Sequence, residues 1–319
     1  MKKKKIAAVI LSVALIIALA ASVYAFPAII KEMNIFQKAA RDGVSISAVG
    51  EAKDFRHTPI NNTKRIDSDI SGKAVATEHF SDDKTDIYNR MLNTIDYLDR
   101  VSVTARTNMI STSESILSYD VNIDAGISYQ SVTENDKLVS ETFSSTESGM
   151  VAVNSIDRTY SEKNVPVYTR KDTPYINLAE RIVDGDDGIP CYYYRRNITN
   201  CPLASYCLVP QEITFSYLKD FDTWEIVDND AEYLGRSCVV INGTPSPYIA
   251  AKHKIDSFKM IVDKETGVLL SFEGMLGDEL IRYMNVTEIS CNDVRTPVRQ
   301  FDEAQYSEYE SLTLKNSED

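Results

Sequence analysis

The sequence predicts an α+β fold built on an antiparallel β-sheet. Short apolar segments run from Val101 to Val153, divided by polar turns, and strand patterns return from Trp224 to Ile289. Strands that follow one another without intervening helices are typical of an antiparallel meander. One amphipathic helix precedes the first group of strands and another lies between the two groups, so helices and strands are largely segregated along the chain.

The first of these helices is predicted to begin near Ser81. Ser81 can cap the first turn, and Asp82 and Asp83 follow where the helix dipole favours negative charge. An apolar stripe at helical spacing comes next, formed by Ile87, Met91, Ile95 and Leu98. We interpret this stripe as the face that packs on the core. The second helix is predicted from Pro210 to Lys219.

The clearest β-hairpin runs from Phe258 to Phe272. Phe258 and Met260 alternate with polar residues before a turn at residues 263–267, and Leu270 and Phe272 alternate after it. Alternation with period two places these four side chains on one face of a strand pair. We therefore expect them to be buried together in the centre of the sheet.

The N-terminus carries an export signal. Lys2 to Lys5 precede an apolar run from Ile6 to Ile30, and Val23-Tyr24-Ala25 has the small residues that a signal peptidase reads. The run is also long enough to span a bilayer, which takes about 20 residues. Cleaved signal and retained anchor both stay open, and both place the rest of the chain outside the cytoplasmic membrane.

Four parts of the chain follow from these patterns. We expect a signal peptide or membrane anchor, then a juxtamembrane helix and tether, then the folded domain, and last an acidic tail that is frayed or solvated. Their ranges are 1–30, 31–80, 81–295 and 296–319.

The charge of the chain excludes some partners. The sequence has 34 Lys and Arg against 47 Asp and Glu, a net charge of −13, and without the four N-terminal lysines the exported part carries −17 (−13 − 4). A surface this acidic repels nucleic acids and gains no electrostatic attraction to an anionic membrane. Any contact with the membrane is expected through the N-terminal segment.

Motifs for catalysis and metal binding are missing from the sequence. Ser216 and Lys219 have the SxxK spacing of penicillin-recognising enzymes, but the SDN and KTG elements are absent. Residues 184–188 and 228–232 resemble the start of calcium loops, yet Arg195 and Val239 stand at the twelfth positions, where an acid is needed. We interpret both segments as acidic turns. We expect a protein that is not an enzyme, with no cofactor and no metal.

Two local clusters remain as candidates. Cys191, Cys201 and Cys207 lie close in sequence, and an exported chain permits a disulfide from Cys191 to either of the others. Cys238 lies in a strand pattern and reads as a small buried hydrophobe. Residues 192–196, Tyr-Tyr-Tyr-Arg-Arg, either line a ligand or form an ordinary strand with half-buried tyrosines.

Two segments resemble a known family. Residues 233–241 read Tyr-Leu-Gly-Arg-Ser-Cys-Val-Val-Ile, and residues 257–270 contain Val-Asp-Lys-Glu-Thr-Gly-Val-Leu-Leu. Together they resemble the outer-membrane lipoprotein carrier superfamily, the LolA, LolB and RseB-like proteins, in its exported Gram-positive type. The resemblance covers about residues 85–292. It implies a strongly curved antiparallel sheet, an incomplete β-barrel, with helices packed in its mouth and no catalytic residues.

The resemblance leaves two classes of function. The first is an extracytoplasmic, non-catalytic binding protein that holds a lipid, lipopeptide or hydrophobic segment in the hollow of the sheet. The second is an RseB-like sensor that docks another exported protein. For the first class, the candidate ligand-binding residues are Phe215, Leu218, Tyr192, Tyr193 and Tyr194.

Overall fold

The computed structural model describes residues 46–47, 62–65, 78–80, 83–111, 113–163, 165–184, 190–292 and 296–312. The chain forms two compact units, Met1–Ile46 and Ser47–Asp319, and the large sheet and its helices belong to the second. The predicted signal or anchor and the predicted Ser81 cap lie outside the described residues. Among the helices that are described, none has both the length and the apolarity to cross a bilayer.

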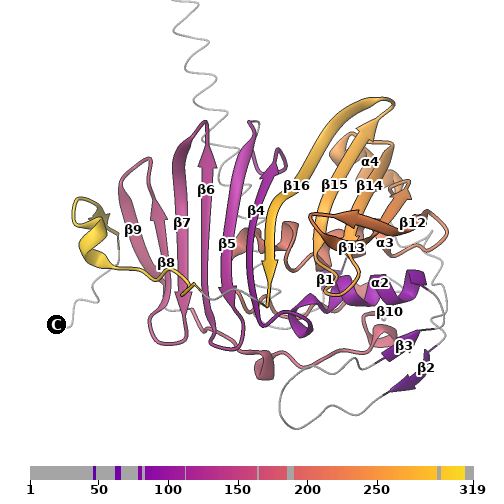
Figure 1. Ribbon diagram of the computed structural model, residues 1–319, viewed down its shortest axis with the longest axis horizontal. Coiled ribbons are helices and arrows are strands. Elements are labelled where there is room, and N and C mark those ends of the chain that lie inside the picture. The colour runs from indigo at the N-terminus through magenta and orange to yellow at the C-terminus, as the bar shows by residue number, and fades with distance from the viewer. Residues whose placement is uncertain are drawn as a thin grey trace, which may run out of the picture. The chain divides into compact units, whose positions relative to one another are not determined.

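Within the described residues, twelve strands form one large sheet (Figure 1). The earlier strands are β4 (Arg100–Thr107), β5 (Ser115–Asn122), β6 (Ile127–Glu134), β7 (Lys137–Ser145), β8 (Gly149–Asn154) and β9 (Thr159–Lys163). The later strands are β12 (Trp224–Tyr233), β13 (Arg236–Gly243), β14 (Ser257–Asp263), β15 (Leu269–Leu276), β16 (Glu279–Cys291) and β17 (Glu310–Ser311). Their order in the sheet is β12-β13-β14-β15-β16-β4-β5-β6-β7-β8-β9-β17.

The strands form two meanders joined side by side. Apart from β17, each strand pairs antiparallel with its neighbours. β17 runs parallel to β9 and makes the sheet mixed. The last strand of the later meander, β16, pairs with β4, the first strand of the earlier one. The predicted α+β class and the antiparallel meander are therefore confirmed, with β17 as an unpredicted addition.

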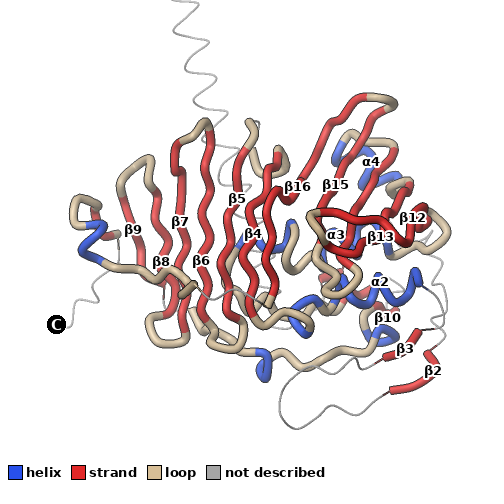
Figure 2. The backbone as a smooth tube through the Cα atoms, viewed as in Figure 1, coloured by secondary structure: helices blue, strands red, loops and turns tan. Residues whose placement is uncertain are grey.

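The sheet is strongly curved but open. The hydroxyl of Tyr233 on β12 donates to the carbonyl of Val286 on β16, at 2.8 Å, although three strands lie between these two in the sheet. In a flat sheet they would be about 19 Å apart, because neighbouring strands are separated by roughly 4.8 Å. The later strands must therefore curl over, as Figure 2 shows. The sheet still ends in β12 on one side and β17 on the other, so it is not a closed barrel.

The remaining elements are short. Small strands are β1 (Ile46–Ser47), β2 (Asn62–Arg65), β3 (Glu78–Phe80), β10 (Ile182–Asp184) and β11 (Pro190–Tyr192). The α-helices are α2 (Asp83–Leu92), α3 (Gln211–Leu218) and α4 (Pro247–His253). The 3-10 helices are η2 (Thr94–Asp96), η3 (Arg170–Asp172), η4 (Leu178–Glu180), η5 (Pro202–Tyr206) and η6 (Glu303–Tyr306).

The main hydrophobic core lies between one face of the sheet and the segments α2, η2, η5 and α3. The predicted stripe of α2 and η2 is confirmed, because Ile87, Met91, Ile95 and Leu98 are all buried in this core. The sheet contributes matching side chains from β4, β5, β14, β15 and β16. The Tyr119 hydroxyl on β5 also donates to the carbonyl of Leu203, at 2.6 Å, and so ties η5 to the sheet.

The predicted hairpin is confirmed as β14 and β15. Phe258, Met260, Leu270 and Phe272 are all buried in the core. The turn is held by Asp263, whose Oδ1 accepts from the backbone N–H of Glu265 and Thr266. Gly267 ends the turn with φ of +74° and lies directly against the backbone of Arg90 on α2, where a Cβ would clash. Glycine thus lets the hairpin turn pack on the helix.

The strands β6 to β9 bury the opposite face of the sheet. Tyr119 pairs with Gln130, so Tyr129, one residue earlier, points to the other side. In the register of the following strands, the side chains on the same face as Tyr129 are those of Phe143, Val151, Glu141, Val153 and Tyr160. These side chains form a second, smaller core with Tyr306.

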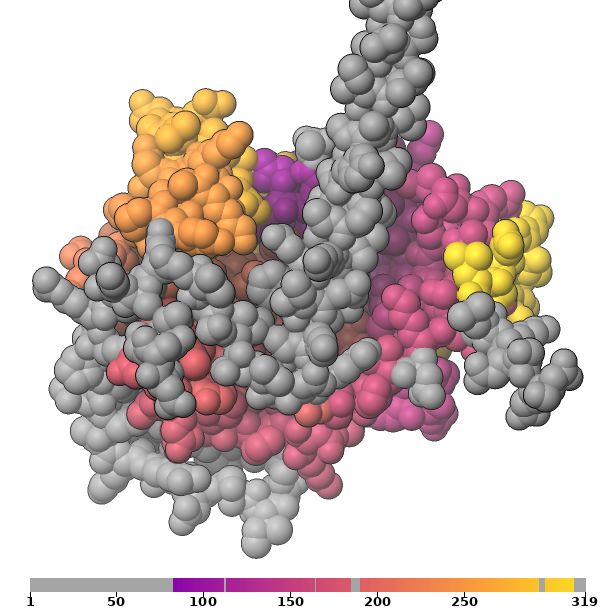
Figure 3. All heavy atoms as spheres, turned by 180° about the vertical axis from the view of Figure 1, so that it is seen from behind, coloured from indigo at the N-terminus to yellow at the C-terminus, as the bar shows by residue number. Residues whose placement is uncertain are grey.

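This second core is covered by residues 296–312, which we name the strap. The strap leads through η6 to β17 and crosses β7 to β9 (Figure 1). Seen from behind, its last part is visible at the edge of the molecule (Figure 3). The segment predicted as a frayed helix or solvated tail thus packs on the sheet over residues 296–312, although most of its side chains are exposed. The many acids of this segment lie on its exposed side, whereas Val298 and Tyr306 are buried.

One smaller prediction also needs correction. Residues 228–232 do not form an acidic turn, because they lie in β12, the edge strand, where two bulges interrupt the pairing. Charges and bulges on an edge strand discourage pairing with other chains.

Candidate functional site

The helix α3 carries the predicted ligand residues into the main core. The prediction of a helix after Pro210 is confirmed, and the carbonyl of Pro210 accepts from the N–H of Thr214 at 2.8 Å. Its buried residues are Gln211, Ile213, Thr214, Phe215, Tyr217 and Leu218. A short helix that is buried on most of its surface is a core element and not a surface lid.

Phe215 lies at the centre of an aromatic cluster. Its ring centroid is 4.9 Å from that of Tyr194, 5.3 Å from that of Tyr192 and 6.5 Å from that of Tyr88. Edge-to-face and tilted contacts at these distances stabilise aromatic pairs. The structure therefore brings together three of the five predicted ligand residues, and their partners are other side chains of the same protein.

The other two predicted residues are placed differently. Leu218 has no exposed surface, and its carbonyl accepts from the indole N–H of Trp224 at 2.9 Å. Tyr193 is 36% exposed and stands outside the core. β11 ends at Tyr192, so the three tyrosines do not form one continuous strand. Alternation nevertheless places Tyr192 and Tyr194 inward and Tyr193 outward, as expected of extended chain.

The concave face of the sheet is filled by these helices. Leu117, Met260, Phe272, Met284 and Val286 on the sheet have no exposed surface. A side chain without exposed surface has no water-sized space beside it. The hollow that the family resemblance implies is thus occupied by the protein's own side chains at these positions.

A polar pair lies where the main core meets solvent. The hydroxyl of Tyr217 on α3 is 2.6 Å from Nδ1 of His253 at the end of α4. The ring of Tyr217 also contacts those of Phe258 and Phe272, at 5.1 and 5.0 Å. Burial, and then the charges of Arg282 and Lys252, lower the pKa of His253 to about 4. This imidazole is therefore neutral near pH 7. No spacing in the sequence indicated that Tyr217 and His253 would meet.

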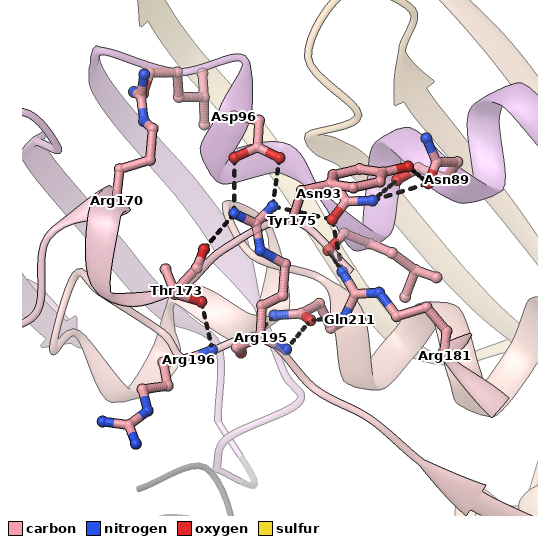
Figure 4. Close-up of polar contacts among 12 residues, drawn as sticks. Asn89, Asn93, Asp96, Arg170, Thr173, Tyr175, Arg181, Arg195, Arg196 and Gln211 are labelled. Atoms are coloured by element: carbon pink, nitrogen blue, oxygen red, sulfur yellow. Dashed lines mark hydrogen bonds and ion pairs between the residues drawn. The ribbon is translucent and has the colours of Figure 1, made fainter. Parts of the chain in front are cut away.

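A buried ion pair lies on the other side of α3 (Figure 4). Arg195 makes a bidentate contact with Asp96 of η2, and the side chains of both are almost completely buried. Nη2 of Arg195 also donates to the carbonyl of Thr173, at 2.7 Å. These contacts join the irregular segment 168–196 to the first helix, across about 100 residues of sequence.

A second buried guanidinium shares this network but has no carboxylate partner in it. Arg181 has no exposed surface and donates to the carbonyls of Leu92 and Tyr193, each at 2.9 Å. It also donates to Oε1 of Gln211 at 3.0 Å and to Oδ1 of Asn93 at 2.6 Å, an oxygen that Arg195 shares. Burial, and then the charge of Arg195, lower the pKa of Arg181 to about 9. The network is a structural clamp that holds α2, η2 and α3 to residues 168–196.

The cysteines predicted to form a disulfide are separated. Cys201 and Cys207 are thiols without exposed surface at the two ends of η5, near the Tyr119 hydroxyl, whereas Cys191 is half-buried on β11. A bridge from Cys191 to Cys201 or Cys207 is not formed in this structure. Burial raises the pKa of Cys201 to about 12 and raises that of Cys207 even further. Cys238 is fully buried in β13, as predicted.

The described residues offer little for metal chemistry. Within the described ranges, no group of three or more His, Cys, Asp or Glu side chains is placed to hold a metal ion. Ser216 lies on α3, and Lys219 follows the last residue of that helix. The second acidic segment, residues 228–232, is an extended strand and not a loop that could wrap a cation.

Comparison with known proteins gives only distant likenesses. No known protein family and no curated protein matches the sequence. An uncharacterized conserved protein from Thermus thermophilus is 7% identical over 73% of this chain and 99% of that one, with a TM-score of 0.36. The MucA/MucB complex of Pseudomonas aeruginosa is matched at 14% identity over 70% and 60% of the two chains, with a TM-score of 0.37.

A lipoprotein, LppX of Mycobacterium tuberculosis, is 14% identical over 68% of this chain and the whole of that one, with a TM-score of 0.28. TM-scores this low do not support a conclusion about fold or function. The resemblance to the LolA superfamily stays a prediction from the sequence.

Proposed function

We propose that this chain is a non-catalytic, extracytoplasmic binding module that docks another exported protein. The observation that carries the proposal is the packing of the concave face. Leu117, Phe272 and Met284 have no exposed surface, and Phe215 and Leu218 of α3 are buried in the same core. Because these positions of the interior are filled by the protein's own side chains, we expect the domain to bind its partner on its surface.

The alternative of an enclosed acyl chain is less well supported. Each buried CH₂ of such a chain gains about 0.8 kcal/mol, but only where space exists for it. Here α3 would have to leave the core first, which means separating Phe215 from three tyrosine rings. Exposing these rings to water would cost several kcal/mol, on the order of the cost of truncating a buried aromatic side chain.

The absence of catalysis is part of the proposal. The buried thiols of Cys201 and Cys207 have raised pKa values, so neither is a thiolate near pH 7. The carboxylate of Asp96 is held by Arg195 within a structural clamp. The extracytoplasmic location rests on the N-terminal charge and apolar pattern, which lies outside the described residues.

Titration of the full-length protein with a fluorescent fatty acid tests the choice between the two classes. We expect no saturable binding, and we expect no acyl chain by mass spectrometry after lipid extraction of the purified protein. Site-specific photo-crosslinking in intact cells should instead capture one exported protein in stoichiometric yield. Saturable fatty-acid binding that is lost in Phe215→Glu, a variant checked for folding by circular dichroism, would restore the lipid-holding function.

A second candidate function has one observation in its favour. Leu276 and Leu280 at the tip of the β15–β16 hairpin, and Tyr248 on the adjacent α4, are about half exposed. They lie at the end of the sheet where the Tyr217–His253 pair is found, so an apolar chain could bind on this rim without opening the core. If fatty acid binds to the wild-type protein and to Phe215→Glu alike, but not to Leu280→Glu, the rim is the site.

A further inference from the structure

The strap covers an aromatic and apolar face of strands β6 to β9, on the side of the sheet away from the main core. On the strap side of β6 to β9 lie Phe143, Val151, Val153 and Tyr160, which form the small core with Tyr306 of the strap. The main core and all its helices lie on the opposite side of the sheet. Without the strap, this face would be an exposed apolar patch, and such patches are typical of binding surfaces.

A buried carboxylate forms a socket within this face. Glu141 on β7 is 2% exposed, and its two oxygens accept from the hydroxyl of Tyr129 at 2.8 Å and from that of Tyr306 at 2.6 Å. Arg299 of the strap donates to Oε1 of Glu141 at 2.7 Å and lies 5.2 Å from the centre of the Tyr129 ring and 5.5 Å from that of Phe143. A carboxylate flanked by aromatic rings is suited to a guanidinium.

The strap also pairs with the sheet as a short strand. β17 runs parallel to β9, and the N–H groups of Glu310 and Leu312 donate to the carbonyls of Arg158 and Tyr160, at 2.9 and 2.8 Å. The pairing of β17 with β9 extends over two residue pairs. An extended segment that adds to a sheet edge through its backbone is a common way to recognise peptides.

The strap has few buried residues, and its side-chain contacts with the aromatic face are concentrated at Arg299, Phe301 and Tyr306. Of its residues, Val298 and Tyr306 are buried, and most of the others are exposed. Its second ion pair, between Arg158 and Glu308, has side chains 58% and 77% exposed, and exposed pairs contribute little to stability. Segments with few buried contacts open at a low free-energy cost.

We propose that the strap-covered face of β6 to β9 is the docking surface for the partner, and that the strap occupies it within the same chain. The partner it fits is an extended protein segment with an arginine followed by aromatic residues, which inserts the arginine at Glu141 and pairs its backbone with β9. The inference rests on the proposed function. The arginine is selected by Glu141, because a buried carboxylate without a positive partner is unfavourable.

A peptide with the sequence of the strap is the probe for this surface. Labelled residues 296–312 are titrated by fluorescence anisotropy into three full-length proteins: the wild type, a weakened-strap variant with Arg299→Ala and Phe301→Ala, and that variant with Glu141→Gln added. Gln300→Ala, an exposed change in the same segment, is the matched control. Tyr129→Phe in the weakened-strap background is a second socket variant that removes one hydroxyl only.

We expect the weakened-strap variant to bind the peptide about tenfold or more tightly than the wild type, because apparent affinity scales with the fraction of open sites. Gln300→Ala should bind as the wild type does, and both socket variants should bind less tightly than their parent. Equal binding to the wild type and the weakened-strap variant would overturn the proposal, as would undiminished binding to both socket variants.

Photo-crosslinking separates the failure of this surface from the failure of the proposed function. One crosslinker is placed at the exposed Glu162 on β9, on the strap side of this strand, and another at the exposed Lys259 on β14. A single exported partner captured at Glu162, in greater yield when the strap is weakened, supports this surface. Capture at Lys259 alone leaves the proposed function standing and overturns the surface. Capture at neither position overturns the proposed function, while the peptide titration still decides what the strap does.

Discussion

Two guanidiniums and one carboxylate are buried together beside α3, and this imbalance makes Asp96 a critical residue. Arg195 pairs with Asp96, and Arg181 shares the same acceptor, Asn93, while its other partners are neutral oxygens. A buried ion pair is only weak evidence for net stability, but removing one partner leaves an uncompensated charge. The clamp therefore tolerates the loss of an arginine better than the loss of the carboxylate.

Asp96→Asn should lower the free energy of unfolding by about 3–5 kcal/mol, the range for breaking a buried pair. Urea denaturation at neutral pH measures it. Asp86→Asn is the control, because Asp86 pairs with Arg90 on the surface of α2, where such a pair contributes about 0.5 kcal/mol or less. Equal effects of the two substitutions would show that Asp96 is not buried in the clamp.

His253 gives the domain a dependence on pH. Its pKa of about 4 in the folded state lies below the ordinary value of about 6.5, because burial and the nearby Arg282 and Lys252 disfavour the imidazolium. Between these two values the unfolded chain binds a proton that the folded chain does not, so stability falls as the pH falls from about 6.5 to 4.

His253→Gln should remove this part of the acid sensitivity. We expect the wild type to lose more unfolding free energy than the variant when the pH is lowered from about 7 to about 4.5, measured by urea denaturation at each pH. Tyr217→Phe keeps the imidazole and should keep the steeper loss. Parallel pH profiles for the wild type and His253→Gln would mean that the imidazole is freely solvated.

At the scale of elements, the β14–β15 hairpin supports the whole main core. Phe258 and Phe272 are 2% and 0% exposed and both contact Tyr217 of α3, so the hairpin and the helix stabilise each other. The helix fills the curve of the sheet, and the sheet in turn buries the side of the helix that carries Tyr217. An element in this position is expected to contribute far more than its length suggests.

Phe258→Ala or Phe272→Ala should each cost about 3–5 kcal/mol, as truncation of buried aromatics does. Lys259→Ala, an exposed change between them on the same strand, should stay within about 0.5 kcal/mol of the wild type. Chemical denaturation of all three variants provides the comparison. A cost below about 1 kcal/mol for both phenylalanines would contradict the observed register.

For the whole molecule, the sheet is used on both faces. Its later strands and β4 and β5 bury one face under the helices, whereas β6 to β9 bury the other under the strap. The strap, near the C-terminus, thus packs against strands that come much earlier in the sequence. One face of the sheet thus carries the main core. The other face is covered by the strap, which we propose a partner can displace.

The location of the molecule is a prediction from its N-terminus alone. We expect residues 44–319 to face outward, so protease added to intact protoplasts should digest them while cytoplasmic marker proteins survive. An epitope placed at the C-terminus and followed by immunoblotting gives the measurement. Full protection of that epitope in intact protoplasts would show that the chain is not exported.

Local patterns in the sequence were sufficient for the elements. The stripe from Ile87 to Leu98, the helix after Pro210 and the hairpin at residues 258–272 were all predictable, because periodicity depends on neighbours a few residues away. The inward position of Phe215 followed from the same reasoning. What surrounds Phe215 did not, because its ring partners come from α2 and from residues 192–194.

By itself, the sequence determined the class of fold, the meander, the core-facing residues of the first helix and of the β14–β15 hairpin, and the acidic charge. Only the tertiary structure decided that β16 pairs with β4, that the concave face is full, that Arg195 meets Asp96, and that the strap covers β6 to β9. The physical reason is the range of the interactions. Alternation shows that two faces of a strand differ, but which segment comes to cover each face depends on the packing of the whole chain.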